Sequence, residues 1–126
     1  MRRRVKVFFD GGCRPNPGRI EAAVVVRGVA HVSDDLGIGS NSDAEWLALI
    51  RALEVAHAQG LGEVDLIGDA IEVVGHADRA LRGGKPANHH AFRFVELAAK
   101  GPPVRVRWIR RAQNLAGIAL AARHPR

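Results

Sequence analysis

The chain has 126 residues, of which 47% are hydrophobic, and its formal net charge at pH 7 is +6. This length suits one domain with a buried core, spanning residues 1–126, and the apolar content argues against disorder. No apolar run is long enough to cross a bilayer, and the first residues lack the apolar segment of a signal peptide. We therefore expect a soluble, cytoplasmic protein with no membrane partner.

The positive charge is mostly arginine, and much of it lies near the two ends of the chain. Because the planar guanidinium group matches the geometry of phosphate oxygens, this charge favours a polyanionic partner such as nucleic acid. Basic residues also promote solubility, so the charge alone leaves both explanations open. The single cysteine, Cys13, excludes an internal disulfide.

The first part of the chain predicts three strands, over residues 4–10, 20–29 and 31–39. In the first strand, Val7 and Phe9 point to one face and Phe8 to the other. The second is rich in β-branched residues, and the third is the weakest of the set. The short links between them favour an antiparallel meander.

A long helix follows over residues 43–59, with Ser42 and Glu45 as the ends of a capping box and Gly60 as a stop signal. The rest of the chain predicts a strand at 63–68, helices at 70–81 and 89–100, a strand at 104–109 and a helix at 112–123. Strands followed by β-α-β units indicate an α/β fold with a mixed sheet and helices on its faces.

Three acidic residues, Asp10, Glu45 and Asp69, lie at the ends of apolar elements. Each has an ordinary explanation: a turn before two glycines, a capping box, and the N-cap of the following helix. However, Glu45 shares its helix face with Ala48 and Leu49, where an isolated carboxylate is costly. Together the three acids suggest a site for a divalent metal.

Four segments carry a family resemblance: residues 10–18 (DGGCRPNPG), 40–45 (SNSDAE), 67–69 (IGD) and 111–114 (RAQN). In order, spacing and predicted elements they resemble the motifs of ribonuclease H, type 1, over nearly the whole chain. The resemblance implies a ribonuclease H-like fold, whose five-stranded mixed sheet has the order 3-2-1-4-5. It also implies a metal-dependent endonuclease that hydrolyses the RNA strand of RNA–DNA hybrids.

The resemblance also assigns roles to individual residues. Asp10, Glu45 and Asp69 would be catalytic and would bind two Mg²⁺ or Mn²⁺ ions, with Asp10 between them. The residues matched to substrate-contacting positions are Gly11, Gly12, Cys13, Asn16, Asn41 and Asn114. Contacts to backbone groups and 2′-hydroxyls would distinguish RNA from DNA.

The chain departs from the family pattern at three places. The family's fourth aspartate is replaced by Ile118, and a position where a glutamine often touches substrate is Ile71. A basic extension is missing from residues 70–100. A neutral oxygen of Asn114, or His124 if the tail folds back, could stand in for the fourth acid. The alternative function is a ribonuclease H-like domain that binds nucleic acid, or a partner, without cutting it.

The six histidines show no spacing typical of a metal site. His89 and His90, at the predicted start of a helix, are expected to face solvent. Cys13 has no neighbouring base that would make it a nucleophile, so we expect a small buried residue there. The sequence leaves the oligomeric state open.

Overall fold

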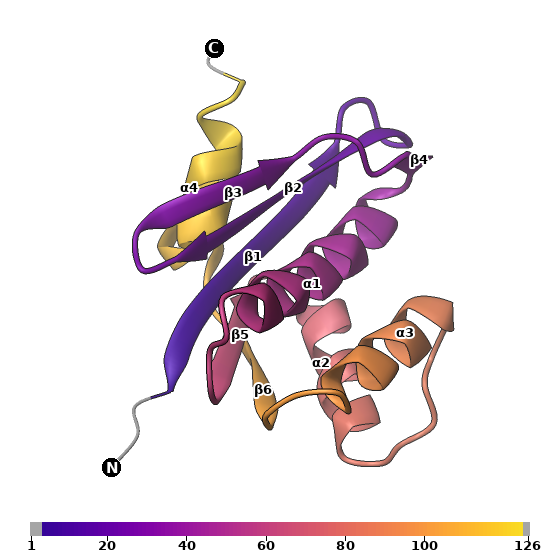
Figure 1. Ribbon diagram of the computed structural model, residues 1–126. Coiled ribbons are helices and arrows are strands. Elements are labelled where there is room, and N and C mark those ends of the chain that lie inside the picture. Colours follow the sequence, from indigo (N-terminus) through magenta and orange to yellow (C-terminus); the bar gives the residue numbers. More distant parts are fainter. Residues whose placement is uncertain (1–3, 125–126) are drawn as a thin grey trace.

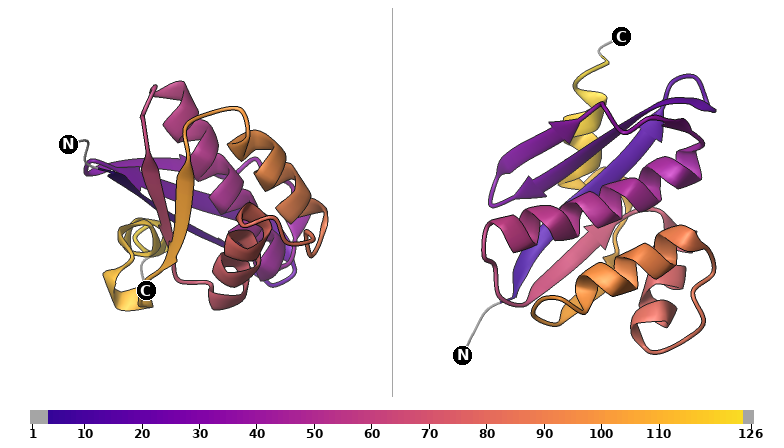
Figure 2. Two further views of the ribbon diagram at one scale, coloured as in Figure 1. Left: turned by 90° about the horizontal axis from the view of Figure 1, so that it is seen from below. Right: turned by 45° about the vertical axis from the view of Figure 1, so that its right-hand side comes forward.

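The computed structural model describes residues 4–124, which form a mixed sheet with helices on both faces (Figure 1). Helices α1 (Asn41–Ala58), α2 (Ile71–Leu81) and α3 (His89–Ala98) cover one face, and α4 (Leu115–Ala121) covers the other (Figure 2). Within residues 4–124, no helix combines the length and apolar character that crossing a membrane requires.

The sheet is built from β1 (Val5–Cys13), β2 (Gly18–Val26), β3 (Val29–Ser33), β4 (Ile38–Gly39), β5 (Val64–Gly68) and β6 (Val104–Trp108). Its order is β3-β2-β1-β5-β6, with the short β4 paired to β2. β1, β2 and β3 are antiparallel neighbours, whereas β5 and β6 run parallel to β1. The predicted order of five strands is confirmed.

Three strand predictions need correction. The strand expected over residues 20–29 ends at residue 26, because the chain turns at Gly28, which has a φ of 80°, and residue 29 begins β3. The strand expected over residues 31–39 is split, because the chain turns between β3 and β4 and Gly37 takes a φ of 91°. The first strand continues three residues past its predicted end at Asp10, since Gly11 to Cys13 pair with β2. Asp10 therefore lies within the part of β1 that pairs with β2, and not at the end of the strand.

The long helix begins earlier than predicted. Its N-cap is Ser40, whose hydroxyl accepts a hydrogen bond from the Asp43 backbone, while the Asp43 carboxylate accepts one from the Ser40 backbone. The capping box predicted between Ser42 and Glu45 is therefore wrong. Glu45 lies in the second turn of α1 and has no capping role.

The last predicted helix, residues 112–123, is in fact two pieces. A short 3₁₀ helix, η1 (Arg111–Gln113), is separated from α4 by Asn114, whose backbone is extended (φ −83°, ψ 106°). Asn114 is the N-cap of α4, because its side-chain oxygen accepts a hydrogen bond from Ala116 N. The interruption lets the Asn114 side chain turn inward toward β1.

The expectation for the paired histidines holds for only one of them. His89 is exposed, but His90 is buried and donates a hydrogen bond from Nε2 to Asp43 Oδ1 at 3.0 Å. Its ring stacks on Trp46, with 6.3 Å between ring centroids. The start of α3 is thereby fixed to the first turns of α1.

The alternation of β1 divides the core into two layers. Val7 and Phe9 are fully buried in the main core under α1, as predicted, whereas Phe8 packs toward the smaller cluster under α4. Asp10 is the next residue on the Phe8 face. The candidate site therefore lies on the side of the sheet that α4 covers.

Ion pairs around one buried acid on β5, Asp65, connect the residue before β1 with the last strand, β6. Asp65, which is 3% exposed, accepts hydrogen bonds from Arg4 at 2.6 Å, Arg105 at 2.9 Å and Arg107 at 3.3 Å. Burial opposes its ionisation, but these arginine hydrogen bonds outweigh that cost and leave the pKa of Asp65 well below its usual value. This stabilising contribution is complete above the unfolded pKa of 3.8 and declines as the pH falls below that value towards the lower pKa of the folded protein.

Asp65→Asn should lower the free energy of unfolding at pH 7 by about 1–3 kcal/mol, because it removes charge-assisted hydrogen bonds from a buried group. The measurement is urea denaturation at pH 7 and at pH 3, and the loss should be smaller at pH 3. Asp78→Asn is the control, since its ion pair with Arg82 is exposed and should contribute little. Equal losses in the two variants would contradict this account.

Candidate active site

Asp10, Glu45 and Asp69 converge at one place, with carboxylate oxygens within 4.8 Å of one another. β1 and β5 are parallel neighbours, and Phe8 pairs with Ile67. Asp10 and Asp69 each lie two residues beyond this pair, so they lie side by side. α1 crosses the sheet and adds Glu45 from its second turn. The three predicted site acids are therefore brought together from segments far apart in the sequence.

Gly11 lets β1 and α1 approach closely enough for this arrangement. A Cβ atom at Gly11 would lie 2.1 Å from the backbone oxygen of Ala44, so no larger residue fits without moving the helix. The Gly11 N–H donates a 2.9 Å hydrogen bond to Glu45 Oε1. Gly11, expected from the resemblance to contact substrate, here positions a site carboxylate.

A hollow of about 500 Å³, lined by Asp10 and Glu45, lies between α4, the β1–β2 hairpin and the start of α1. Its lining includes Gly12, Cys13 and Asn41 from the expected substrate-contacting set, and the basic residues Arg14 and Arg111. It therefore combines acidic groups, which can hold a cation, with basic groups, which can bind phosphate.

A polar strap fixes one wall of this hollow. Asn41 Oδ1 accepts a hydrogen bond from Cys13 N at 3.1 Å, and Asn16 Oδ1 accepts one from Asn41 N at 3.1 Å. Cys13 is 7% exposed, as expected for a small buried residue, while Asn16 and Asn41 are exposed. These contacts tie the β1–β2 hairpin to the N-terminus of α1 and leave amide groups accessible.

Burial and mutual repulsion disfavour ionisation of the acids. Burial, followed by the charge of Asp10, raises the pKa of Glu45 to about 8. Burial, followed by the charge of Asp69, raises the pKa of Asp10 to about 7, although Arg111 opposes this shift. A divalent cation among the three carboxylates would offset the repulsion, so the donor set fits a hard metal ion.

Asn114 holds Asp69 and is not available as a metal ligand. Its side chain is fully buried, and Nδ2 donates to Phe9 O at 3.0 Å and to Asp69 Oδ2 at 2.8 Å. The carbonyl of Phe9 can only accept, so the amide nitrogen must face the acids. The side-chain oxygen caps α4 instead. The neutral oxygen suggested as a replacement for the fourth acid is therefore used elsewhere.

Ile118 lines the hollow, as the match to the fourth aspartate led us to expect. Its side chain is 56% exposed, and the preceding residue, Gly117, lies beside the acids, since a Cβ there would be 3.6 Å from Asp10 Oδ2. Ile71, at the first position of α2, is 66% exposed. No acidic residue occurs after Glu96, so α4 contributes no carboxylate to the site.

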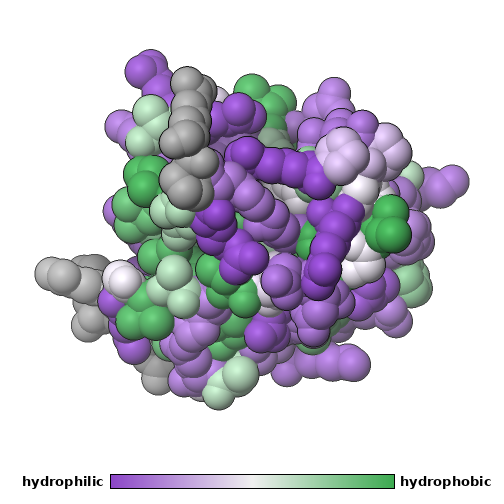
Figure 3. All heavy atoms as spheres, turned by 90° about the horizontal axis from the view of Figure 1, so that it is seen from above, coloured by the Kyte–Doolittle hydropathy of each residue, from purple (hydrophilic) through white to green (hydrophobic). Residues whose placement is uncertain are grey.

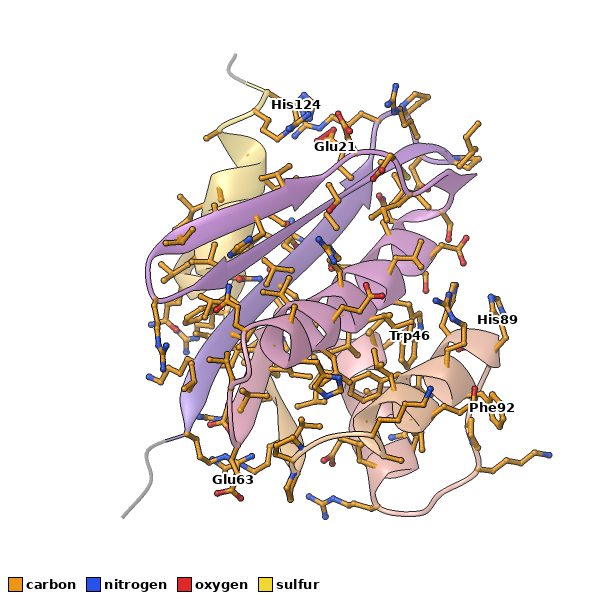
Figure 4. The ribbon with its side chains drawn as sticks, in the orientation of Figure 1. Glu21, Trp46, Glu63, His89, Phe92 and His124 are labelled. Atoms are coloured by element: carbon orange, nitrogen blue, oxygen red, sulfur yellow. The ribbon has the colours of Figure 1, made fainter. Side chains whose placement is uncertain are left out.

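Sequence reasoning missed Glu21, which lines the same hollow from β2. The tail does fold back, because His124 donates from Nε2 to Glu21 Oε1 at 2.5 Å (Figure 4). The available signal was a charged residue between Ile20 and Ala22, in a strand whose other residues from Ile20 onward are apolar. That Glu21 lies on the same face of the sheet as Asp10 follows only from the register between β1 and β2.

The family model described as reverse transcriptase-like matches residues 8–124. Ribonuclease HI of Halobacterium salinarum is 42% identical over 102 residues, which are 77% of this chain and 49% of that protein. The chain belongs to the ribonuclease H type 1 family. It spans about half the length, 49%, of that curated relative.

Two solved ribonuclease H structures resemble this one over most of their length. RNase H1 from the halophilic archaeon Halobacterium salinarum is 29% identical, has a TM-score of 0.77, and is covered over 94% of both chains. LC11-RNase H1, solved in complex with an RNA/DNA hybrid, is 26% identical, has a TM-score of 0.74, and is covered over 93% of both chains. The sheet with its flanking helices is thus the ribonuclease H fold.

Replacing one site carboxylate should stabilise the metal-free protein. At pH 8 the folded wild type carries ionised acids at a cost, since the pKa of Asp10 is raised from 3.8 to about 7. Asp10→Asn should raise the free energy of unfolding by about 1–3 kcal/mol at pH 8, with a smaller gain at pH 5. Urea denaturation in the presence of a chelator measures this difference.

The control is Asp35→Asn, because Asp35 is exposed and its charge should matter little at either pH. A gain that stays the same from pH 5 to pH 8 would contradict the assigned repulsion.

Proposed function

We propose that this chain is a metal-dependent endonuclease that hydrolyses the RNA strand of RNA–DNA hybrids. The observation that carries the proposal is the convergence of Asp10, Glu45 and Asp69 within 4.8 Å, next to a hollow that Arg14 and Arg111 also line. A relative of similar structure was solved with an RNA/DNA hybrid, which supports this class of substrate.

Asp10, Glu45 and Asp69 would hold Mg²⁺ or Mn²⁺, because hard cations prefer oxygen ligands. When bound, the metal would lower the pKa of a water molecule and neutralise charge on the scissile phosphate. The chain's own groups prepare this site: the Gly11 N–H fixes Glu45, and the Asn114 amide fixes Asp69. Preorganised ligands need little rearrangement when the cation binds.

Substrate would be held by groups around the rim of the hollow. Arg14 and Arg111 supply cationic groups for backbone phosphates, and the net charge of +6 supports a polyanionic partner. The strap of Cys13, Asn16 and Asn41 would contact the RNA strand, where a 2′-hydroxyl distinguishes RNA from DNA. Seen from above, this end of the molecule is largely hydrophilic, as such contacts require (Figure 3).

One observation favours a second function. Ile118 stands in the hollow where the family pattern has its fourth aspartate, so a second metal ion has no carboxylate from α4. A domain with this loss could bind hybrid without cutting it. The two functions differ in turnover, since both predict salt-dependent binding of nucleic acid.

The nuclease function predicts cleavage of a labelled RNA–DNA hybrid by the purified chain. Cleavage should stop with chelator and with Asp10→Asn, and Mn²⁺ should support it better than Mg²⁺ because it binds such ligands more tightly. A hybrid whose RNA strand is replaced by DNA should remain intact. If hybrid binds in a salt-dependent way but survives high protein concentrations with either metal, the binding function replaces the nuclease.

Ile118→Asp should raise Mg²⁺-dependent cleavage at least tenfold, which corresponds to about 1.4 kcal/mol of activation free energy. The stability cost should be small, because the Ile118 side chain is 56% exposed. Leu115→Asp is a matched control: this residue is also on α4 and is 45% exposed, but it does not line the hollow. Faster cleavage by both variants, or by neither, would show that a carboxylate at position 118 does not act through the metal site.

A further inference from the structure

Glu21 lines the hollow together with Asp10 and Glu45, and it comes from β2 instead of α4. Asp10 pairs with Ala23 and Gly12 pairs with Glu21, so Glu21 lies on the Asp10 face of the sheet, one diagonal position away. Such diagonal neighbours are about 7–8 Å apart at their Cα atoms. On this face Ala23 and Val25 are apolar and pack under α4, and Glu21 stands where this buried apolar row ends.

The two carboxylate oxygens of Glu21 have different surroundings. Oε1 accepts the hydrogen bond from His124, whereas Oε2 has Arg123 Nε at 3.2 Å but no hydrogen bond of acceptable geometry. The Glu21 side chain is 13% exposed, and Oε2 itself is shielded from solvent. Because Oε2 is shielded from solvent, its charge is compensated by the Arg123 guanidinium. Oε1 accepts one hydrogen bond and, as a carboxylate oxygen with two lone pairs, can accept a second from a water molecule.

The side of the hollow formed by α4 contains no acidic side chain. Gly117 has no side chain beside Asp10, and Ile118 cannot coordinate a cation. Among residues 4–124, only Asp10, Glu45 and Asp69 meet the 4.8 Å limit for a shared ion, so Glu21 is too far away to join them directly. Magnesium and manganese ions retain water ligands, and these can donate hydrogen bonds to a carboxylate one layer further out.

We propose that Glu21, held in place by His124 and Arg123, supports a second divalent cation beside Asp10 by accepting hydrogen bonds from that cation's water ligands. This role replaces the carboxylate that Ile118 does not supply. The proposal rests on the proposed function, because the second cation shares Asp10 with the first. It concerns cation binding, which is measurable without nucleic acid and without turnover.

Glu21 also has a competing structural role, and the chain provides a control for it. Arg123 contacts both Glu21 and Asp34, the latter through Nη2 at 3.4 Å. Each acid therefore helps to fix the segment after α4. Asp34 does not line the hollow, so Asp34→Asn weakens the same attachment without affecting a cation there.

The experiment is a Mn²⁺ titration of the full chain, with free Mn²⁺ followed by electron paramagnetic resonance. Wild type should bind two Mn²⁺ ions, the second more weakly. Glu21→Gln should weaken the second site at least tenfold and leave the first unchanged, while Asp34→Asn should change neither. Circular dichroism and thermal melts with chelator check that each variant is folded.

A double variant extends the test. Ile118→Asp should restore the second site in the Glu21→Gln background, because a carboxylate then returns to the family position. One Mn²⁺ per wild-type chain, or equal effects of Glu21→Gln and Asp34→Asn, would overturn the proposal. Failure to cleave hybrid would instead overturn the proposed function, and would leave the ion count as a separate result.

Discussion

The candidate site depends on one backbone contact, the approach of β1 to α1 at Gly11. The strand and the helix meet so closely there that a Cβ would collide with the Ala44 carbonyl. The same contact brings the Gly11 N–H to Glu45 and sets that carboxylate beside Asp10. A bulkier residue would push α1 away from the sheet and separate the acids, so packing and ligand geometry are fixed together.

The acids oppose the stability that this packing provides. Fully buried neighbours such as Phe9 and Leu49 contribute to folding, whereas Asp10 and Glu45 are forced into a poorly hydrated place near a like charge. Asn114 offsets part of this cost by donating to Asp69. A protein selected for stability alone would not retain this arrangement, which is why the acids are best explained by a ligand.

Sequence patterns predicted the mixed sheet and the three acids because both follow from local signals: alternation, β-α-β order, and charged residues at element ends. The strand order was implied by the family resemblance. The start of α1 was predicted wrongly, since Ser40 with Asp43 and Ser42 with Glu45 are competing capping patterns two residues apart. The break at Asn114 was hidden in a run of small residues with good helix propensity. Its inward turn is set by partners on β1 and β5, which no local signal reveals.

Glu21 shows why an acid on β2 differs from one on α4. An aspartate at position 118 would add a further negative charge to a site where burial and repulsion already raise the pKa of two acids. Glu21 stands one diagonal position away and is paired with Arg123 and His124, so its charge is largely balanced before any cation arrives. The chain thereby keeps a carboxylate within reach of the hollow at a lower electrostatic cost. The disadvantage is distance, because a ligand that acts through water holds a cation less firmly than one that coordinates it directly.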